Sequence, residues 1–246
     1  DGMKFAQTPR PVSDSIRDAA QARWGWHWEN QETPQRPVGI TPLYSKVKLW
    51  CVPNVESVRP VGPPAPNSPD FQTAANELND VLDNLTNDQR KIANFWSDGL
   101  GTYTPPGHWN RFACESIVKN RYNPLRAARV LAYLNMAMQD AGIACWDAKY
   151  YFHYPRPIQA MPGFKTILGT PNFPSYTSGH SMFSAAGAEV LSYIFPADAA
   201  TFQNYSEEAA LSRLYGGIHY RFDITDGNTS GKAVGQYTID RMKVDG

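Results

Sequence analysis

Apolar residues recur three and four positions apart along most of the chain beyond residue 71, which is the spacing of one face of an α-helix. Runs of strictly alternating apolar and polar residues, which are typical of strands, are almost absent. The clearest helical run, NPLRAARVLAYLNMAMQDAGIACW, opens with Asn123 and Pro124, residue types that favour a helix start. These signals predict helices over residues 71–84, 87–97, 108–120, 124–146, 178–195, 199–215 and 230–243.

A mostly helical chain of 246 residues can bury a substantial core and favours an all-α fold. We expect a helical bundle in which functional polar side chains project between facing helices. The first 70 residues differ, because six prolines lie between Pro53 and Pro69 and proline is excluded from regular helices and central strands. We therefore expect residues 1–70 to form an irregular, Pro-rich segment that wraps the surface, and residues 71–246 to form the helical domain.

Composition excludes several classes of partner. The 23 Lys and Arg residues balance the 23 Asp and Glu residues and form no basic run, so no nucleic acid or anionic membrane is indicated. No apolar stretch is long enough to span a membrane, and the first residues lack the apolar core of a signal peptide, so we expect a soluble chain without membrane insertion. The three cysteines have no CxxC spacing that would hold zinc.

Two cations lie close together in the stretch KYYFHYPRP. Lys149 and Arg156 are set among aromatic residues, and Pro157 is expected to end the helix that precedes it. Two buried cations this close require an anion beside them, because an unpaired buried charge is strongly unfavourable. The pair alone has a simpler interpretation, since cations near aromatic rings commonly make surface cation–π contacts.

A second candidate site lies where the apolar run SMFSAAGAEVLSYIF begins. Ser178 and Gly179 stand at this helix start, whose free N–H groups and positive dipole end attract an oxyanion. His180 would lie beside that anion. Taken alone, a Ser-Gly-His triplet is most often only a helix cap.

The third cluster lies in SRLYGGIHYRFD and contains Arg213, His219 and Asp223. The spacing of His219 and Asp223 on a helical turn places the carboxylate within reach of one imidazole nitrogen. Such a bond fixes the tautomer and leaves the other nitrogen free as a nucleophile or metal ligand. Taken alone, a histidine and an aspartate at this spacing more often form a pair on a helix surface. Together, however, the three clusters supply cations, a hydroxyl, N–H donors and two histidines, a set that suits a phosphate-like or vanadate-like oxyanion.

In order and internal spacing, the motifs Lys149-x6-Arg156-Pro157, Ser178-Gly179-His180 and Ser212-Arg213-x5-His219-x3-Asp223 resemble the three-part signature shared by vanadium-dependent haloperoxidases and type 2 phosphatidic acid phosphatases. The stretches FWSDG, TPPGHWN, FPSY and HYRFD look more like the haloperoxidase branch, particularly the bacterial proteins similar to fungal vanadium chloroperoxidase. The resemblance spans roughly residues 50–240.

The resemblance implies a vanadate cofactor, in a site that phosphate could also occupy. His219 would bind vanadium, His180 would bond the apical oxygen and act as acid and base, and Asp223 would orient His219. The groups expected to neutralise the other oxygens are Lys149, Arg156, Ser178, the Gly179 N–H and Arg213. Lys149 would also polarise the bound peroxide.

Three further residues gain expected roles from the resemblance. Trp146 and Phe173 would line the halide side, and Asp98 would brace one of the arginines. Vanadate(V) would act as a Lewis acid on hydrogen peroxide, and a halide ion would be oxidised to hypohalous acid, which halogenates a small organic acceptor. Phe173 stands where vanadium bromoperoxidases often carry a second histidine, which points away from that type and leaves chloride and iodide open.

Two other functions stay open. A phosphatase could use the same residues, with His219 forming a phosphohistidine and His180 protonating the leaving group. A helical module could bind phosphate without catalysis, although anion binding alone does not require both histidines and Asp223. The sequence departs from the family pattern at Thr177, where proline is usual, and family members are longer at the amino end.

The remaining expectations concern histidines and context. His27, His108 and His153 lack a spaced partner, and we expect them to be structural or exposed, with His153 the first exception to consider because it lies inside the cationic stretch. The resemblance suggests a secreted or periplasmic protein and is compatible with a homo-oligomer.

Overall fold

The computed structural model describes residues 8–31, 39–99 and 101–246. Within these residues the chain forms α-helices and short 3₁₀ turns and no strand, so the expectation of an all-α fold is confirmed. Parts of the predicted wrapping segment, residues 1–7 and 32–38, lie outside the described residues. No helix in the described part of the chain is long and apolar enough to cross a membrane.

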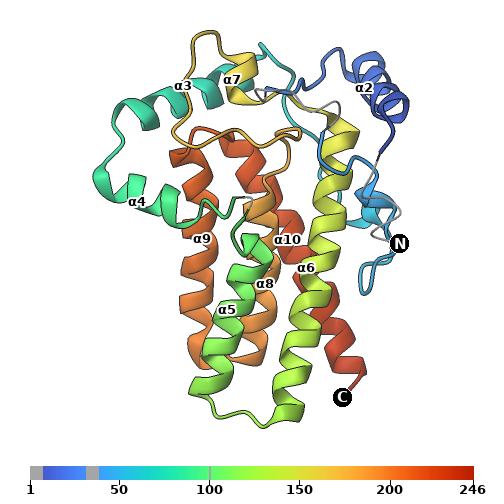
Figure 1. Cartoon of the computed structure of the whole chain (residues 1–246), viewed down its shortest axis with the longest axis vertical. Helices are drawn as coiled ribbons and strands as arrows, with labels where there is room; N and C mark the ends of the chain where they lie inside the picture. The colour runs from blue at the N-terminus through green and yellow to red at the C-terminus, as the bar shows by residue number, and fades with distance from the viewer. Residues whose placement is uncertain (1–7, 32–38, 100) are drawn as a thin grey trace.

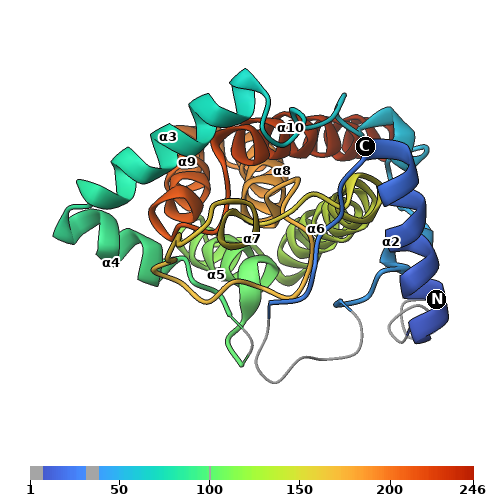
Figure 2. The same ribbon diagram turned by 90° about the horizontal axis from the view of Figure 1, so that it is seen from above.

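Long helices that run up and down form the body of the molecule (Figure 1). They are α5 (Thr104–Lys119), α6 (Pro124–Phe152), α8 (Gly179–Ile194), α9 (Ala199–Tyr215) and α10 (Arg221–Val244). Seen from above, α8 lies in the middle, and it contacts each of the other four (Figure 2). Its sequence, GHSMFSAAGAEVLSYI, is apolar on nearly every side, as a helix surrounded by others requires.

Shorter elements surround the end of the bundle where α6 ends and α8 begins, which is the top in Figure 1 and is called the upper end here. α3 and α4 lie along one side of it, and α2 lies on the other side beside α6 (Figure 2). The bounds of these elements are α2 (Arg10–Trp24), α3 (Pro69–Asp83), α4 (Asn87–Phe95) and α7 (Pro157–Ala160), with 3₁₀ turns at Tyr44–Lys46, Val55–Ser57 and Pro196–Asp198.

The amino-terminal segment is not irregular throughout, because residues 10–24 form α2. Pro11 in its first turn and the left-handed Gly25 (φ 79°) at its end are ordinary start and stop signals. The described residues from 39 to 68 contain 3₁₀ turns and otherwise irregular backbone. This stretch is fixed to α6 by the buried Asp140 carboxylate, which accepts hydrogen bonds from the N–H groups of Trp50, Cys51 and Val52.

α6 is longer than the sequence predicts, since it continues beyond residue 146 to Phe152. The last turns stay helical because their aromatic side chains are packed, as shown by the ring of Phe152 against those of Trp24 and Tyr176. His153 ends the helix in the left-handed conformation (φ 50°). Pro157, expected to end this helix, instead opens α7. Lys149 therefore projects from a helix, in a fixed direction.

α10 also begins earlier than predicted, at residue 221 instead of 230. The stretch DGNTSG is a poor helix former, but its glycines lie where α10 meets α8. A Cβ on Gly227 would lie 2.8 Å from the Ser178 carbonyl oxygen, and one on Gly235 would lie 2.6 Å from Cβ of Glu189. The helices approach so closely that only glycine fits, and packing outweighs propensity. We call Gly227, Gly231 and Gly235 the glycine seam.

We predict that Gly231→Ala destabilises the protein, although alanine is the better helix former by about 1 kcal/mol. The new Cβ would meet the Met182 carbonyl oxygen and lie 2.8 Å from Cβ of Ala185. We expect the free energy of unfolding, measured by urea denaturation, to fall by about 1–3 kcal/mol. The control is Gly169→Ala, where a Cβ has no atom within 4 Å. If both variants unfold alike, the seam is not closely packed.

Candidate functional site

The candidate residues meet at the upper end of the bundle (Figure 1), from elements far apart in sequence. The last turns of α6 and α9 supply Lys149 and Arg213, while the first turn of α8 supplies His180. His219 lies just before α10, and Arg156 lies just before α7. Each of these five side chains is buried or nearly so. Burial lowers the pKa of His219, and the three cations lower it as well.

Lys149 holds the loop that leads into α8. Its Nζ donates to the carbonyl oxygens of Pro174 (2.9 Å), Ser175 (2.8 Å) and Thr177 (2.5 Å). Burial, together with the charge of Arg156, lowers the pKa of Lys149 to about 7. All three of its N–H donors are thus bonded to the loop, so its effect on a bound anion would be mainly electrostatic.

Arg156 is completely buried beside His219. Its Nε donates to the Phe173 carbonyl oxygen (3.0 Å), and its Nη1 donates to the Ile218 carbonyl oxygen (2.7 Å) and lies 3.1 Å from His219 Nε2. Burial lowers the pKa of Arg156 to about 10, while Asp223 raises it. Its Nη2 is buried and has no hydrogen-bond partner among the described residues. This guanidinium therefore has donor capacity that the protein itself does not use.

His219 and Asp223 are hydrogen bonded, with 2.7 Å between Nδ1 and Oδ2. The pair does not lie on a helix surface as the spacing alone suggests, because His219 precedes α10 and Asp223 is in its first turn. The same Oδ2 accepts from Ser175 Oγ (2.5 Å) and the Tyr220 N–H (3.3 Å). Because the carboxylate Oδ2 is an acceptor, the proton of His219 is assigned to Nδ1. The lone pair of Nε2 then points toward Arg156.

Burial has opposite effects on the two partners of this pair. It raises the pKa of Asp223 to about 6 and lowers the pKa of His219 well below its usual value. Sequence reasoning assigned no role to Ser175, although FPSY is part of the motif. Its place in that motif was the one feature of the sequence that pointed to Ser175. Its contact with Asp223 could not be predicted, because the two residues are far apart in sequence and meet only in the folded chain.

The amino-terminal ends of α8 and α10 are tied together. Ser178 caps α8 by accepting from the Ser181 N–H (3.2 Å), and the Ser178 N–H donates to the Asp223 carbonyl oxygen (2.9 Å). Both helices thus direct their positive ends at the same region, beside Gly179 and His180. Two helix dipoles and three cations make this region strongly favourable for an anion.

Arg213 is buried near His180. Its Nε donates to Ser212 Oγ (2.9 Å), and its Nη2 donates to the Trp96 carbonyl oxygen (2.6 Å). Burial lowers the pKa of Arg213 to about 9, and Asp98 is the nearby charge that raises it. Asp98 accepts a hydrogen bond from His108. Its effect on Arg213 is therefore a charge interaction at a distance and not a direct ion pair.

Aromatic rings form one wall of this cluster. The rings of Trp146 and Phe173 lie 5.1 Å apart, and Lys149 Nζ and the Arg156 guanidinium lie 4.9 Å and 5.1 Å from the Phe173 ring. Trp146 and Phe173 are both partly exposed, whereas the cations behind them are buried. Phe173 therefore contacts both cations while part of its own ring surface is exposed.

The other histidines differ from one another. His153 is buried and its Nδ1 accepts from the Trp28 N–H (3.0 Å), which is a structural contact. His27 contacts Gln21 and Glu29 at the surface. His108 is fully buried beside Asp98, which gives it a place near the site that the sequence did not reveal.

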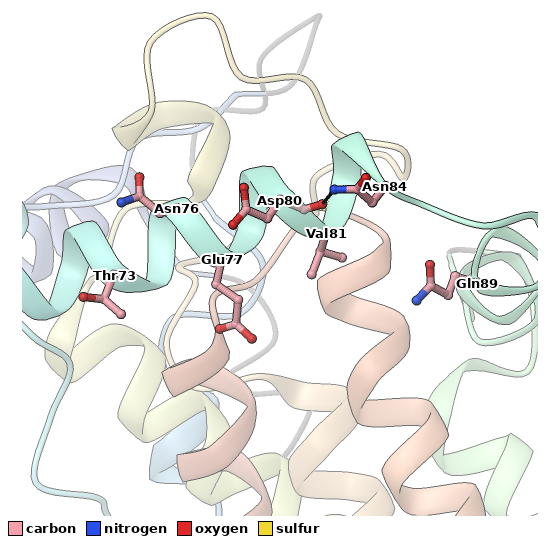
Figure 3. Close-up of a pocket in the computed structure, with 7 residues that line it drawn as sticks. All are labelled: Thr73, Asn76, Glu77, Asp80, Val81, Asn84 and Gln89. Atoms are coloured by element: carbon pink, nitrogen blue, oxygen red, sulfur yellow. Dashed lines mark hydrogen bonds between the residues drawn. The ribbon is translucent and has the colours of Figure 1, made fainter.

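A surface hollow of about 570 Å³ lies elsewhere, along α3 and the start of α4 (Figure 3). Its lining is Thr73, Asn76, Glu77, Asp80, Val81, Asn84 and Gln89. None of these residues belongs to the cationic cluster. The side chain of Glu77 points toward α10, where it pairs with Arg221 (2.7 Å). The chemistry-bearing residues therefore do not line this hollow.

In the described residues no group of three or more His, Cys, Asp or Glu side chains could hold a metal cation directly. The cluster around His219 instead combines cations with a single imidazole lone pair. This donor set suits an oxyanion, including a metal oxyanion that takes one nitrogen ligand.

Comparison with known proteins supports this assignment. Residues 129–241 match the family model of the PAP2 superfamily. Vanadium chloroperoxidase from Curvularia inaequalis is 28% identical over 112 residues, which are 34% of this chain and 18% of that protein.

Two solved structures share the fold over most of the chain. A bacterial vanadium-dependent iodoperoxidase has a TM-score of 0.78 at 29% identity, covering 89% of this chain and 60% of that one. A holo bacterial vanadium-dependent chloroperoxidase has a TM-score of 0.71 at 15% identity, covering 84% and 55%. The chain thus spans less than two thirds of the length of these relatives. Its carboxy-terminal half is thus similar to the PAP2 superfamily, and its fold is that of the bacterial vanadium haloperoxidases.

Proposed function

We propose that this protein is a vanadate-dependent haloperoxidase, which uses hydrogen peroxide to oxidise a halide ion. The observation that carries the proposal is the buried cationic cluster around His219 with the Trp146 and Phe173 wall on one side. The similarity to the iodoperoxidase, at 29% identity over 89% of this chain, supports the same reading.

The residues present fit vanadate. Arg156 Nη2 is a buried polar atom without a hydrogen-bond partner in the described chain. Such atoms are rare in proteins and indicate an interaction that the polypeptide alone does not supply. The tautomer of His219 leaves Nε2 as the nitrogen that can bind a metal, and Asp223 fixes that tautomer.

Arg156, Arg213 and Lys149 would balance the charge of the anion, with Ser178 and the Gly179 N–H at the start of α8. His219 Nε2 would be the vanadium ligand. When bound, vanadate supplies a Lewis-acid centre that activates hydrogen peroxide toward halide.

His180 would carry the proton of the peroxide. Burial and the nearby Arg213 lower its pKa well below the usual value, so the imidazole is neutral at neutral pH. The negative charge of a bound anion would raise this pKa again and favour proton acceptance. Asp223 would keep His219 oriented rather than exchange protons with the substrate, because its Oδ2 already holds three hydrogen bonds.

The aromatic wall suggests the halide preference. Large, polarisable halides are weakly hydrated and lose little by leaving water for an aromatic surface beside a cation, and iodide is the most easily oxidised of the common halides. With the iodoperoxidase as a similar structure, we propose iodide as the halide that is oxidised fastest.

A phosphatase reaction is the second candidate, because the bond between Asp223 and His219 also leaves Nε2 able to attack phosphorus. The partly exposed rings of Trp146 and Phe173, together with the similarity to the iodoperoxidase, favour the first candidate.

The first prediction concerns sulfate, which does not titrate near neutral pH. Burial lowers the pKa of Lys149 to about 7, so above that pH the amine of the free protein is mostly neutral. A bound dianion favours the charged ammonium, and Lys149 must therefore take up a proton when sulfate binds above pH ~7. Sulfate affinity, measured by calorimetry, should fall up to about tenfold per pH unit above pH ~7. Lys149→Met should bind more weakly with a flat profile, and the exposed Lys165→Met should behave as wild type. A flat wild-type profile would contradict the assigned state of Lys149.

The second prediction concerns activity. Purified protein loaded with orthovanadate should oxidise halides in the presence of hydrogen peroxide, fastest with iodide, as followed by halogenation of a phenolic dye. Hydrolysis of p-nitrophenyl phosphate is measured in parallel on the vanadate-free protein. Hydrolysis without halide oxidation would replace the first candidate by the second.

The third prediction concerns the vanadium ligand. His219→Ala should abolish vanadate-dependent turnover while thermal unfolding shows an intact fold, because the imidazole is the one nitrogen ligand assigned to the metal. His27→Ala, at the surface, should keep full activity. Full turnover in His219→Ala would refute the assignment.

A further inference from the structure

His108 occupies a place next to the site that neither its sequence context nor the proposed reaction explains. It lies in the second turn of α5 and its side chain is completely buried. Four rings surround it, those of Trp96, Phe112, Phe95 and Tyr103, at centroid distances of 4.4, 4.9, 4.9 and 5.1 Å. Among the described residues its polar partner is Asp98.

The Asp98 carboxylate lies between two imidazoles. Its Oδ2 is 3.2 Å from His108 Nδ1 and 3.7 Å from His180 Nε2, and its side chain is only 4% exposed. The three side chains come from the first turn of α8, from α5 and from the loop that joins α4 to α5. They therefore form a row, His108 to Asp98 to His180, that ends at the proposed acid–base group.

The electrostatics of this row follow from its burial. Burial raises the pKa of Asp98, while the hydrogen bond from His108 and the nearby Arg213 lower it. Removal of the His108 donor would leave a buried carboxylate without its direct partner, which favours protonation or rotation toward Arg213. In either case His180 would lose the oriented negative charge that faces its Nε2.

The backbone conformation of Asp98 indicates that a rigid neighbour such as His108 must hold this residue in place. Asp98 has φ 42°, in the left-handed region that few residues other than glycine adopt, so surrounding contacts must hold it there. His108 can do this because it projects from a helix and is enclosed by aromatic rings. A carboxylate on a loop is thus held in place by a side chain on a rigid element.

We propose that His108 is a positioning residue for the acid–base step, which holds the Asp98 carboxylate against His180 and thereby fixes the orientation and tautomer of the His180 imidazole. Only the kinetic readout of this inference rests on the proposed haloperoxidase function.

Two substitutions separate the hydrogen bond from the packing. His108→Phe keeps the ring but removes the donor to Asp98, while His108→Asn places an amide N–H near the position of Nδ1 and keeps the donor. In the vanadate-free protein, ring ¹⁵N chemical shifts of His180 report which nitrogen carries the proton. We expect the Nε2–H tautomer in wild type and in His108→Asn, and a mixture of tautomers in His108→Phe. This readout requires neither vanadate nor a particular reaction.

With vanadate bound, His108→Phe should lower kcat by roughly ten- to a hundredfold, part of the usual contribution of a general acid or base. The KM for halide and the Kd for orthovanadate should stay within about threefold, because the cations that hold the anion are untouched. His108→Asn should recover most of the lost kcat. Asp98→Asn combined with His108→Phe should be little slower than either single variant, since both act through one contact.

The control is Phe112→Leu, which disturbs packing on the His108 ring without touching the hydrogen bond and should lower only the Tm. The inference is overturned if His180 keeps one tautomer in His108→Phe. It is also overturned if kcat, vanadate affinity and Tm fall together in His108→Phe and in Phe112→Leu, which would make His108 a packing residue. If wild type oxidises no halide, the proposed function fails, while the tautomer result still decides the role of His108.

Discussion

Lys149, Arg156 and Arg213 place three positive charges inside the protein, and the rest of the site is arranged around that constraint. An uncompensated buried charge is strongly unfavourable, so each cation is bonded to carbonyl oxygens that the loops direct toward it. These bonds fix the cations but do not neutralise them. Burial consequently lowers all three pKa values, and the charge of Arg156 also lowers those of Lys149 and Arg213. A multiply charged anion is the partner that relieves both effects.

The helices determine where these charges meet. The glycine seam brings α10 against α8, and this close approach allows the Ser178 N–H to reach the Asp223 carbonyl oxygen. His219 and His180 are thereby held on neighbouring helix starts, with two helix dipoles directed at the same region. Close packing between two helices therefore controls the geometry of the charged site.

Much of this could be predicted from the sequence. Apolar periodicity gave the all-α fold and most helix positions, because those helices bury one face and have clear caps. It failed at residues 221–229, where the glycine seam makes a poor helix former helical, and at 147–152, where tertiary packing extends α6. The helix at residues 10–24 was not predicted, because the prolines from Pro53 to Pro69 led us to expect irregular structure over the whole of residues 1–70.

The candidate site could be predicted as a set of residues but not as a geometry. The motif spacing identified Lys149, Arg156, His180, Arg213 and His219, while Ser175 and His108 act on their partners through contacts that no local pattern encodes. Asp98 was expected beside an arginine, and its charge does act on Arg213, but its hydrogen bond is with His108, which the sequence did not indicate.

The most direct test of the central claim is diffraction at the vanadium absorption edge from crystals soaked with orthovanadate. The charge arrangement predicts one anomalous peak at bonding distance from His219 Nε2, between the guanidinium groups of Arg156 and Arg213. A peak at another location, or none in that region at a concentration that saturates binding, would contradict the account.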